Sequence, residues 1–265
     1  MLARMSDHWW GSFELGLGSA ARWRVGPLIL TVTHLRNEWR VCRGTSDDPG
    51  DRSRDVDLGR QPVDPAPGEL VTRYAATDGV DTLRLTPILP DRSVVTRPEQ
   101  ALTVPGRARG SMFVGSPLFL RLEEAEGPTL LEELPAFRPK LTWWGPNARE
   151  GVVCHASRTA GRLRLEDVVN HPHRVVTEVE IVNRAASPLK VERLNLPVRR
   201  LSVYADQQGE LWTESVTLER SEGEEFAELQ LGDRPPAEAG PTDRLGPPRD
   251  ASGLALFRAF GSLFQ

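Results

Sequence analysis

The sequence predicts a mainly β protein, built from two β-sandwich-like halves with a short C-terminal helix. Several short segments alternate polar with apolar residues, which is the period-2 pattern of a half-buried strand. Proline and glycine are frequent, with 22 and 23 of 265 residues, and they interrupt these segments. Frequent proline and glycine between segments are typical of short strands joined by turns. Apolar residues at helical spacing occur at the C-terminal end.

The N-terminal half, residues 1–126, is predicted to be β-rich. Residues 24–32 end in a β-branched apolar run, and residues 38–43 and 82–87 alternate polar with apolar side chains. Residues 45–68 are rich in Asp, Arg, Pro and Gly, so we expect a long exposed loop there. Short segments broken by proline and glycine complete this half.

The C-terminal half, residues 137–233, is predicted to be sandwich-like and to follow a connector or helical turn at residues 123–135. Polar turn residues at 183–188 predict a hairpin between their two flanking strands, and residues 206–209 predict a second hairpin. The strands expected in this half are residues 140–144, 151–156, 162–166, 175–182, 189–194, 201–204, 211–213, 215–218 and 225–231.

Residues 234–265 are predicted to be a proline-rich linker followed by an amphipathic tail. The linker spans residues 234–252. An isolated helix over residues 254–264 would be marginal in water, so it needs a surface to lie on. That surface could belong to its own chain, to a partner or to a membrane, and we expect its own chain. The apolar stripe of this helix consists of Leu256, Phe257, Phe260, Leu263 and Phe264.

Composition excludes several classes of protein. An apolar run of 18 residues is lacking, so we expect no transmembrane segment. The first 13 residues have no apolar core of a signal peptide, so a cytoplasmic protein is expected. Two cysteines rule out a disulfide scaffold, and a formal charge of −4 argues against nucleic-acid binding. The basic stretch at Arg193, Arg199, Arg200 and Arg220 is balanced by nearby glutamates, so we interpret it as a charged sheet face.

Scattered short motifs indicate a family relationship over most of the chain. The sequence resembles the prokaryotic domain-of-unknown-function 432 family. The resemblance implies no catalytic residues, because the family has no assigned activity. It also implies members in archaea and bacteria, some encoded near small mechanosensitive channel genes, which makes a membrane channel or another protein a candidate partner. The matching segments are residues 97–118, 141–145, 153–156, 181–184, 194–198, 201–204, 211–215, 247–249 and 257–264.

One candidate metal site is His171, His173 and Glu178. Residues two apart on a strand share a face, so the two imidazoles could bind one metal with a later carboxylate. The His-x-His-x4-Glu spacing resembles the first metal motif of cupins. The flanking glycines and a second motif are missing, and Pro172 favours a turn or strand edge. The alternative is a pair of surface loop histidines, for which we expect no cofactor.

The other polar motifs form no coherent catalytic set. Cys154 and His155 are neighbours on a predicted strand, so their side chains point to opposite faces and cannot act as nucleophile and base. We expect a small buried cysteine beside a half-exposed histidine. The glutamate pairs at residues 123–124, 132–133 and 224–225 are expected on solvated faces, and no nucleophile elbow, phosphate loop or dinucleotide motif is found.

The aromatic residues are the candidates for partner binding. Neighbouring residues of a strand face opposite ways, so at least one of Trp143 and Trp144 should be exposed or at an interface. Packing in the core is the alternative for every tryptophan in a β protein. The candidate partner-binding residues are Trp143, Trp144, Trp212, Phe257, Phe260 and Phe264.

Three functional hypotheses follow from these observations. The first is a non-enzymatic binding or accessory module with a protein partner, supported by the apolar tail and by the tryptophan pairs Trp9-Trp10 and Trp143-Trp144. The second is a metal-dependent, cupin-like enzyme or small-molecule binder that uses His171, His173 and Glu178. The third is a structural homo-oligomer. Because fold does not determine function, these hypotheses have to be separated by the site.

Overall fold

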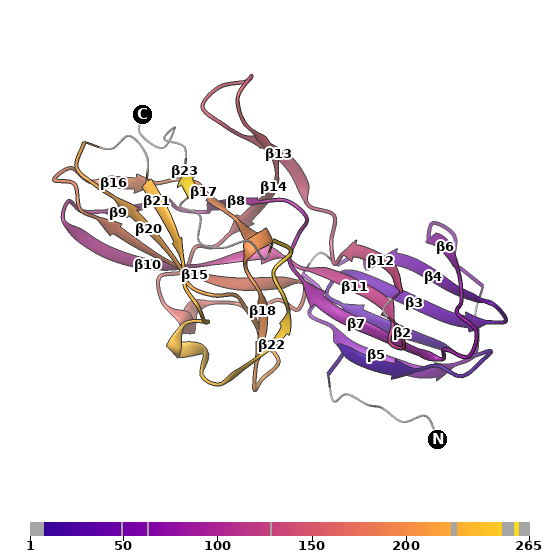
Figure 1. The fold of residues 1–265 in the computed structure, drawn as a ribbon. Helices are drawn as coiled ribbons and strands as arrows, with labels where there is room; N and C mark the ends of the chain where they lie inside the picture. Colours follow the sequence, from indigo (N-terminus) through magenta and orange to yellow (C-terminus); the bar gives the residue numbers. More distant parts are fainter. Residues whose placement is uncertain are drawn as a thin grey trace. The chain divides into compact units, whose positions relative to one another are not determined.

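The chain forms two compact units, each assembled from separate stretches of sequence. The computed structural model describes residues 8–48, 50–62, 64–127, 129–223, 227–250 and 257–259. Unit 1 comprises residues 1–87, 118–137 and 171–173, and unit 2 comprises residues 88–117, 138–170 and 174–265. Strands predominate throughout the described residues, whose helical elements are three 3-10 turns (Figure 1). The mainly β fold is therefore confirmed, whereas the division into halves 1–126 and 137–233 stays a prediction.

Unit 1 contains two sheets. The first has the order β5-β2-β3-β4-β6 and the second has the order β1-β7-β11-β12. The strands of the first sheet are β2 (Ala20–Val25), β3 (Leu28–Leu35), β4 (Glu38–Thr45), β5 (Arg54–Arg60) and β6 (Leu70–Ala75). Those of the second are β1 (Gly11–Glu14), β7 (Thr82–Ile88), β11 (Phe119–Glu124) and β12 (Leu130–Pro135).

Contacts between these two sheets form the core of unit 1. The rings of Phe13 on β1 and Trp23 on β2 pack edge to face, with their centroids 5.3 Å apart. The indole N–H of Trp39 on β4 donates a hydrogen bond of 2.9 Å to Glu124 Oε1 on β11. Thr77 also donates to this buried carboxylate through its backbone N–H and its hydroxyl. Burial of these aromatic side chains removes a large apolar area from water, which stabilises the unit.

Unit 2 is built around the long strand β15. The largest sheet has the order β22-β18-β19-β15-β20-β21-β23, and β10 pairs with β15. A second sheet has the order β13-β14-β8-β17, and β16 pairs with β9. The strands of the largest sheet are β10 (Ala108–Pro117), β15 (Arg174–Asn183), β18 (Val203–Asp206), β19 (Leu211–Trp212), β20 (Val216–Arg220), β21 (Ala227–Leu231), β22 (Thr242–Gly246) and β23 (Phe257–Ala259). The others are β8 (Val94–Pro98), β9 (Leu102–Val104), β13 (Lys140–Trp144), β14 (Val152–Thr159), β16 (Leu189–Val191) and β17 (Leu194–Leu196).

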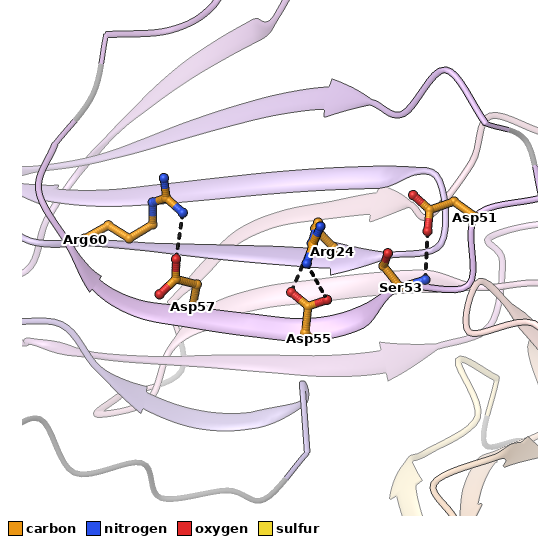
Figure 2. A network of polar contacts seen from close by, with 6 residues as sticks. All are labelled: Arg24, Asp51, Ser53, Asp55, Asp57 and Arg60. Atoms are coloured by element: carbon orange, nitrogen blue, oxygen red, sulfur yellow. Dashed lines mark hydrogen bonds and ion pairs between the residues drawn. The ribbon is translucent and has the colours of Figure 1, made fainter.

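The predicted exposed loop at residues 45–68 is wrong in part, because it contains β5. This strand pairs with β2 along the end of the sheet, with Val56 opposite Trp23. Figure 2 shows the ion pairs that accompany it: Arg24 contacts both carboxylate oxygens of Asp55, at 3.1 and 3.0 Å, and Arg60 contacts Asp57 at 2.6 Å. Pairing with β2 and these ion pairs stabilise β5 as a strand, although its polar sequence does not predict one.

Three further predictions of local structure are wrong. The expected strand at 24–32 is divided by a turn at Gly26, whose positive φ of 57° is accessible to glycine. Residues 130–135 form β12 instead of a connector or helical turn, since they pair with β11. Residues 162–166 form a bridge and a 3-10 turn instead of a strand.

Two predictions for the C-terminal half and the tail, a hairpin and a helix, are also corrected. The strand after the polar turn at 183–188 is β16, and it pairs with β9 rather than forming a hairpin with β15. The predicted helix at 254–264 is wrong at Phe257–Ala259, which form β23 beside β21. The sheet edge supplies hydrogen-bond partners that a short isolated helix lacks. Residues 251–256 and 260–265, including Leu256, Phe260, Leu263 and Phe264, lie outside the described residues.

Candidate functional site: an apolar hairpin in unit 2

The antiparallel hairpin of β13 and β14 concentrates exposed apolar side chains. Leu141, Trp143, Val152 and Val153 expose 61, 41, 55 and 43% of their surfaces. Leu141 lies opposite His155 and Trp143 lies opposite Val153, so Leu141, Trp143 and Val153 share one face of the hairpin. We call these three residues the apolar face. The end of the hairpin projects from the rest of unit 2 (Figure 1).

Hydrogen bonds within the hairpin hold its loop in one conformation. The indole N–H of Trp143 donates to the carbonyl of Asn147 at 2.8 Å. The side-chain oxygen of Asn147 accepts the backbone N–H groups of Arg149 and Glu150, at 2.8 and 2.9 Å. The polar end of the Trp143 ring is therefore bonded within its own chain, and the remaining ring surface is apolar.

Two glycines make this loop possible. A Cβ on Gly145 would lie 2.0 Å from the carbonyl oxygen of Glu150, and a Cβ on Gly151 would lie 2.4 Å from that of Trp144. Both distances are shorter than real side chains show, so the two sides of the loop approach too closely for any other residue. The hairpin is therefore ordered by contacts within its own sequence.

On the opposite face of the hairpin, Trp144 and Cys154 are buried, whereas Val152, which pairs with Trp144, is exposed. Trp144 exposes 3% of its surface and packs with Cys154 and Val95, and the guanidinium of Arg193 lies 4.8 Å from the centroid of its ring. The expectation that at least one member of this tryptophan pair is exposed agrees with the structure, because Trp143 is the exposed member.

The remaining aromatic candidates are either buried or outside the described part of the structure. Trp212 is buried, and its indole N–H donates to Asp206 Oδ2 at 2.9 Å. The rings of Trp144 and Trp212 are thus not accessible to a partner in this conformation. Phe257 lies on β23, and its side chain is outside the described part of the structure, as are Phe260 and Phe264 entirely.

Cys154 and His155 point to opposite faces of β14, as the sequence predicts. Burial raises the pKa of the Cys154 thiol, which makes the thiol less reactive near neutral pH. The expectation of a half-exposed His155 is wrong, since only 7% of this residue is exposed. Its Nε2 lies 2.7 Å from Asp91 Oδ1, a contact between distant segments that the sequence does not show.

The proposed metal ligands are divided between the two units. The rings of His171 and His173 belong to unit 1, and their centroids are 5.2 Å apart. His173 is buried and packs edge to face with Phe137, at 5.3 Å between centroids. Glu178 belongs to unit 2, where its carboxylate accepts a hydrogen bond of 2.9 Å from Ser215. Among the described residues, no group of three His, Cys, Asp or Glu side chains that could hold a metal is found.

Two of the predicted surface groups have partners within the chain. Glu124 is fully buried, contrary to the expectation of a solvated glutamate pair, because the hydrogen bonds from Trp39 and Thr77 satisfy its carboxylate. In the basic stretch, Arg199 forms two hydrogen bonds of 2.8 Å with Asp250, and Arg220 donates to the backbone of Ser187. These arginines therefore hold together separate segments of unit 2.

Sequence reasoning missed Leu141, Val152 and Val153 as surface residues. A signal was present, because Trp143-Trp144 and Val152-Val153 are both apolar pairs on strands. Neighbouring residues of a strand face opposite sides, so each pair must place one apolar side chain on the outer face. The pairing of β13 with β14, which places Val153 on the same face as Leu141 and Trp143, is visible only in the structure.

The fold and the hairpin define a class of protein: a mainly β chain of two units, with an ordered apolar hairpin on the second. The part of the chain that the structure describes includes no helix long and apolar enough to cross a membrane. A family model described as "Protein of unknown function (DUF432)" matches residues 9–264. The chain therefore belongs to this family, which confirms the resemblance found in the sequence. Comparisons with curated proteins and with solved structures gave no match.

Proposed function

We propose that the protein is a non-enzymatic binding module that holds a protein partner on the apolar face of the β13–β14 hairpin. In this proposal each unit is a β-sandwich that serves as a rigid support. The observation that carries it is the clustering of Leu141, Trp143 and Val153 on one projecting hairpin. Adjoining exposed apolar side chains are characteristic of interaction sites, whereas single ones are ordinary.

The order of the hairpin supports this function. Binding is weakened by the entropy lost when a flexible segment becomes ordered. The Asn147 hydrogen bonds and the close approach at Gly145 and Gly151 reduce that loss, because the loop is already held in place. Trp143 would act as the anchor, since tryptophan is enriched among residues that dominate binding energy.

A photoreactive amino acid at position 141 tests this proposal in cells of the organism that encodes the protein. We expect a discrete protein adduct after irradiation, because this position lies within the apolar face. The same amino acid at Leu17, which is 67% exposed in unit 1, is the control. With the partner in hand, Trp143→Ala should weaken binding by roughly 30-fold or more. Identical adduct patterns at the two positions would reject the proposal.

A metal-dependent enzyme or small-molecule binder is the second candidate, favoured by the 5.2 Å separation of the His171 and His173 rings. Elemental analysis of untagged protein, purified without chelator, is the test. This candidate requires near-stoichiometric zinc, iron, manganese or nickel that is lost in His171→Ala/His173→Ala. Because His173 is buried, His171→Ala alone provides a variant that should remain folded. Folded wild-type protein without metal would exclude this candidate.

A further inference from the structure

We propose that β13 pairs in antiparallel fashion with β13 of a second copy of the chain, so that the sheet β13-β14-β8-β17 continues across a two-fold axis. This inference rests on the proposed function, because it names the partner of the same hairpin. β13 is the end strand of its sheet. In an antiparallel pair about half of the backbone N–H and C=O groups of the outer strand point away from its neighbour. These groups can bind another strand.

The sequence of β13 does not protect this edge. Proteins usually discourage pairing at an exposed edge with charged residues, proline or bulges. β1 and β17 end their sheets without interior charges too, but Phe13 of β1 and Leu194 and Leu196 of β17 are buried, unlike Leu141 and Trp143 of β13. β5, β6, β12 and β22 also end their sheets, and each has charged residues in its interior. In β5 these charges are held in the ion pairs of Figure 2. In β13 the only charged residue is Lys140, at the first position. The interior charges of the other four strands are Asp55 and Asp57, Arg73, Glu132 and Glu133, and Asp243 and Arg244.

The five residues of β13 are complementary to themselves in one register. If the two-fold axis passes between the two Thr142 residues, Leu141 lies opposite Trp143 of the second copy, and this pair occurs twice. Both residues belong to the apolar face, so their contacts bury surface that is exposed in the single chain. Threonine pairs and aliphatic–aromatic pairs are favourable across strands.

The charges of the hairpin are compatible with this register. Lys140 lies opposite Trp144 of the second copy, so the two lysines lie at opposite ends of the paired strands and no like charges face each other. A two-fold contact of this kind closes on itself and yields a dimer rather than a fibre. The register therefore predicts a discrete dimer, with the edge of β13 covered.

Sedimentation equilibrium of the purified full chain tests the inference. We expect wild-type protein to dimerise at or below about 100 µM, within the range of small protein interfaces. Leu141→Lys/Trp143→Lys and Leu141→Glu/Trp143→Glu should each weaken the dimer about 30-fold or more, because like charges then lie directly opposite. Leu70→Lys, on the edge strand β6, is the matched control and should leave the dimer unchanged, since Leu70 is equally exposed at 61%.

Mixing the two double variants tests the register. Lysines at both positions of one chain would lie opposite glutamates of the other, so native mass spectrometry should show a heterodimer that neither variant forms with itself. A monomeric wild-type protein, or a dimer insensitive to both double variants, would overturn the inference. An adduct between position 141 and a different protein would also overturn it but would leave the proposed function standing. Lack of any adduct specific to position 141 would reject both.

Discussion

Replacing Glu124 by alanine is expected to destabilise the protein by about 3–5 kcal/mol, because buried donors lose their acceptor. Glu124 is fully buried on β11 and joins the two sheets of unit 1. Its carboxylate accepts hydrogen bonds from the Trp39 indole at 2.9 Å, and from the Thr77 backbone and hydroxyl at 2.9 and 2.6 Å. Urea unfolding followed by tryptophan fluorescence measures the loss.

Two further variants isolate the role of the carboxylate. Glu124→Gln retains one acceptor oxygen but turns an amide N–H₂ towards other donors, so we expect an intermediate loss of about 1–3 kcal/mol. Glu126→Ala removes an exposed glutamate just after the same strand and should change stability by less than about 0.5 kcal/mol. Equal losses for Glu124→Ala and Glu126→Ala would contradict this account.

The same carboxylate should contribute to the pH dependence of stability. Burial acts to raise the pKa of Glu124, but the hydrogen bonds from Thr77 and Trp39 outweigh it and hold the pKa below its usual value. A lowered pKa in the folded state stabilises the protein above the pKa of the unfolded chain, and this contribution is lost as pH falls through the folded pKa. Below about pH 4.3, the usual value for glutamate, wild-type protein should therefore lose stability more steeply than Glu124→Gln.

The substitution Gly106→Ala is expected to destabilise unit 2 by about 3 kcal/mol, because the new methyl group meets fixed backbone. A Cβ on Gly106 would lie 1.9 Å from the carbonyl oxygen of Ala186. The turn at Ala185–Ala186 cannot easily move, since Arg107 donates its N–H to the Ala185 carbonyl at 3.0 Å. Glu222 accepts the N–H of Ala186 at 2.8 Å.

Gly110→Ala is the matched control for this prediction. Gly110 lies on β10, four residues after Gly106, and a Cβ there would meet only Val104 within 4 Å, at an ordinary distance of 3.7 Å. We expect its effect on the free energy of unfolding to stay within about 0.5 kcal/mol. Urea unfolding of both variants makes the comparison, and similar losses of stability would contradict a backbone clash at residue 106.

Local sequence patterns were sufficient to predict those strands in which polar and apolar residues alternate. The predicted strands at 38–43, 82–87 and 175–182 correspond to β4, β7 and β15. The turn at 206–209 joins β18 to β19 as predicted. In the three strands the apolar residues repeat at the period of the pleat, and the turn has polar residues and a glycine, so each signal is contained in the segment itself.

Predictions failed where a strand depends on a partner that is distant in the sequence. β5 is polar and becomes a strand by pairing with β2, while β16 pairs with β9 across more than eighty residues. The buried state of Glu124 likewise depends on Trp39 and Thr77, which precede it by 85 and 47 residues. No window of local sequence contains these interactions.

The amino-acid sequence was enough to predict the mainly β fold, the family, the opposite orientations of Trp143 and Trp144, and the separation of Cys154 from His155. These follow from short-range periodicity and from motifs, both of which are properties of the chain alone. The folded chain was needed to see which strands pair, which charged groups are buried and which apolar residues share a surface, because contacts between distant segments set strand pairing and burial. The apolar face of the hairpin therefore exists only once β13 and β14 have come together.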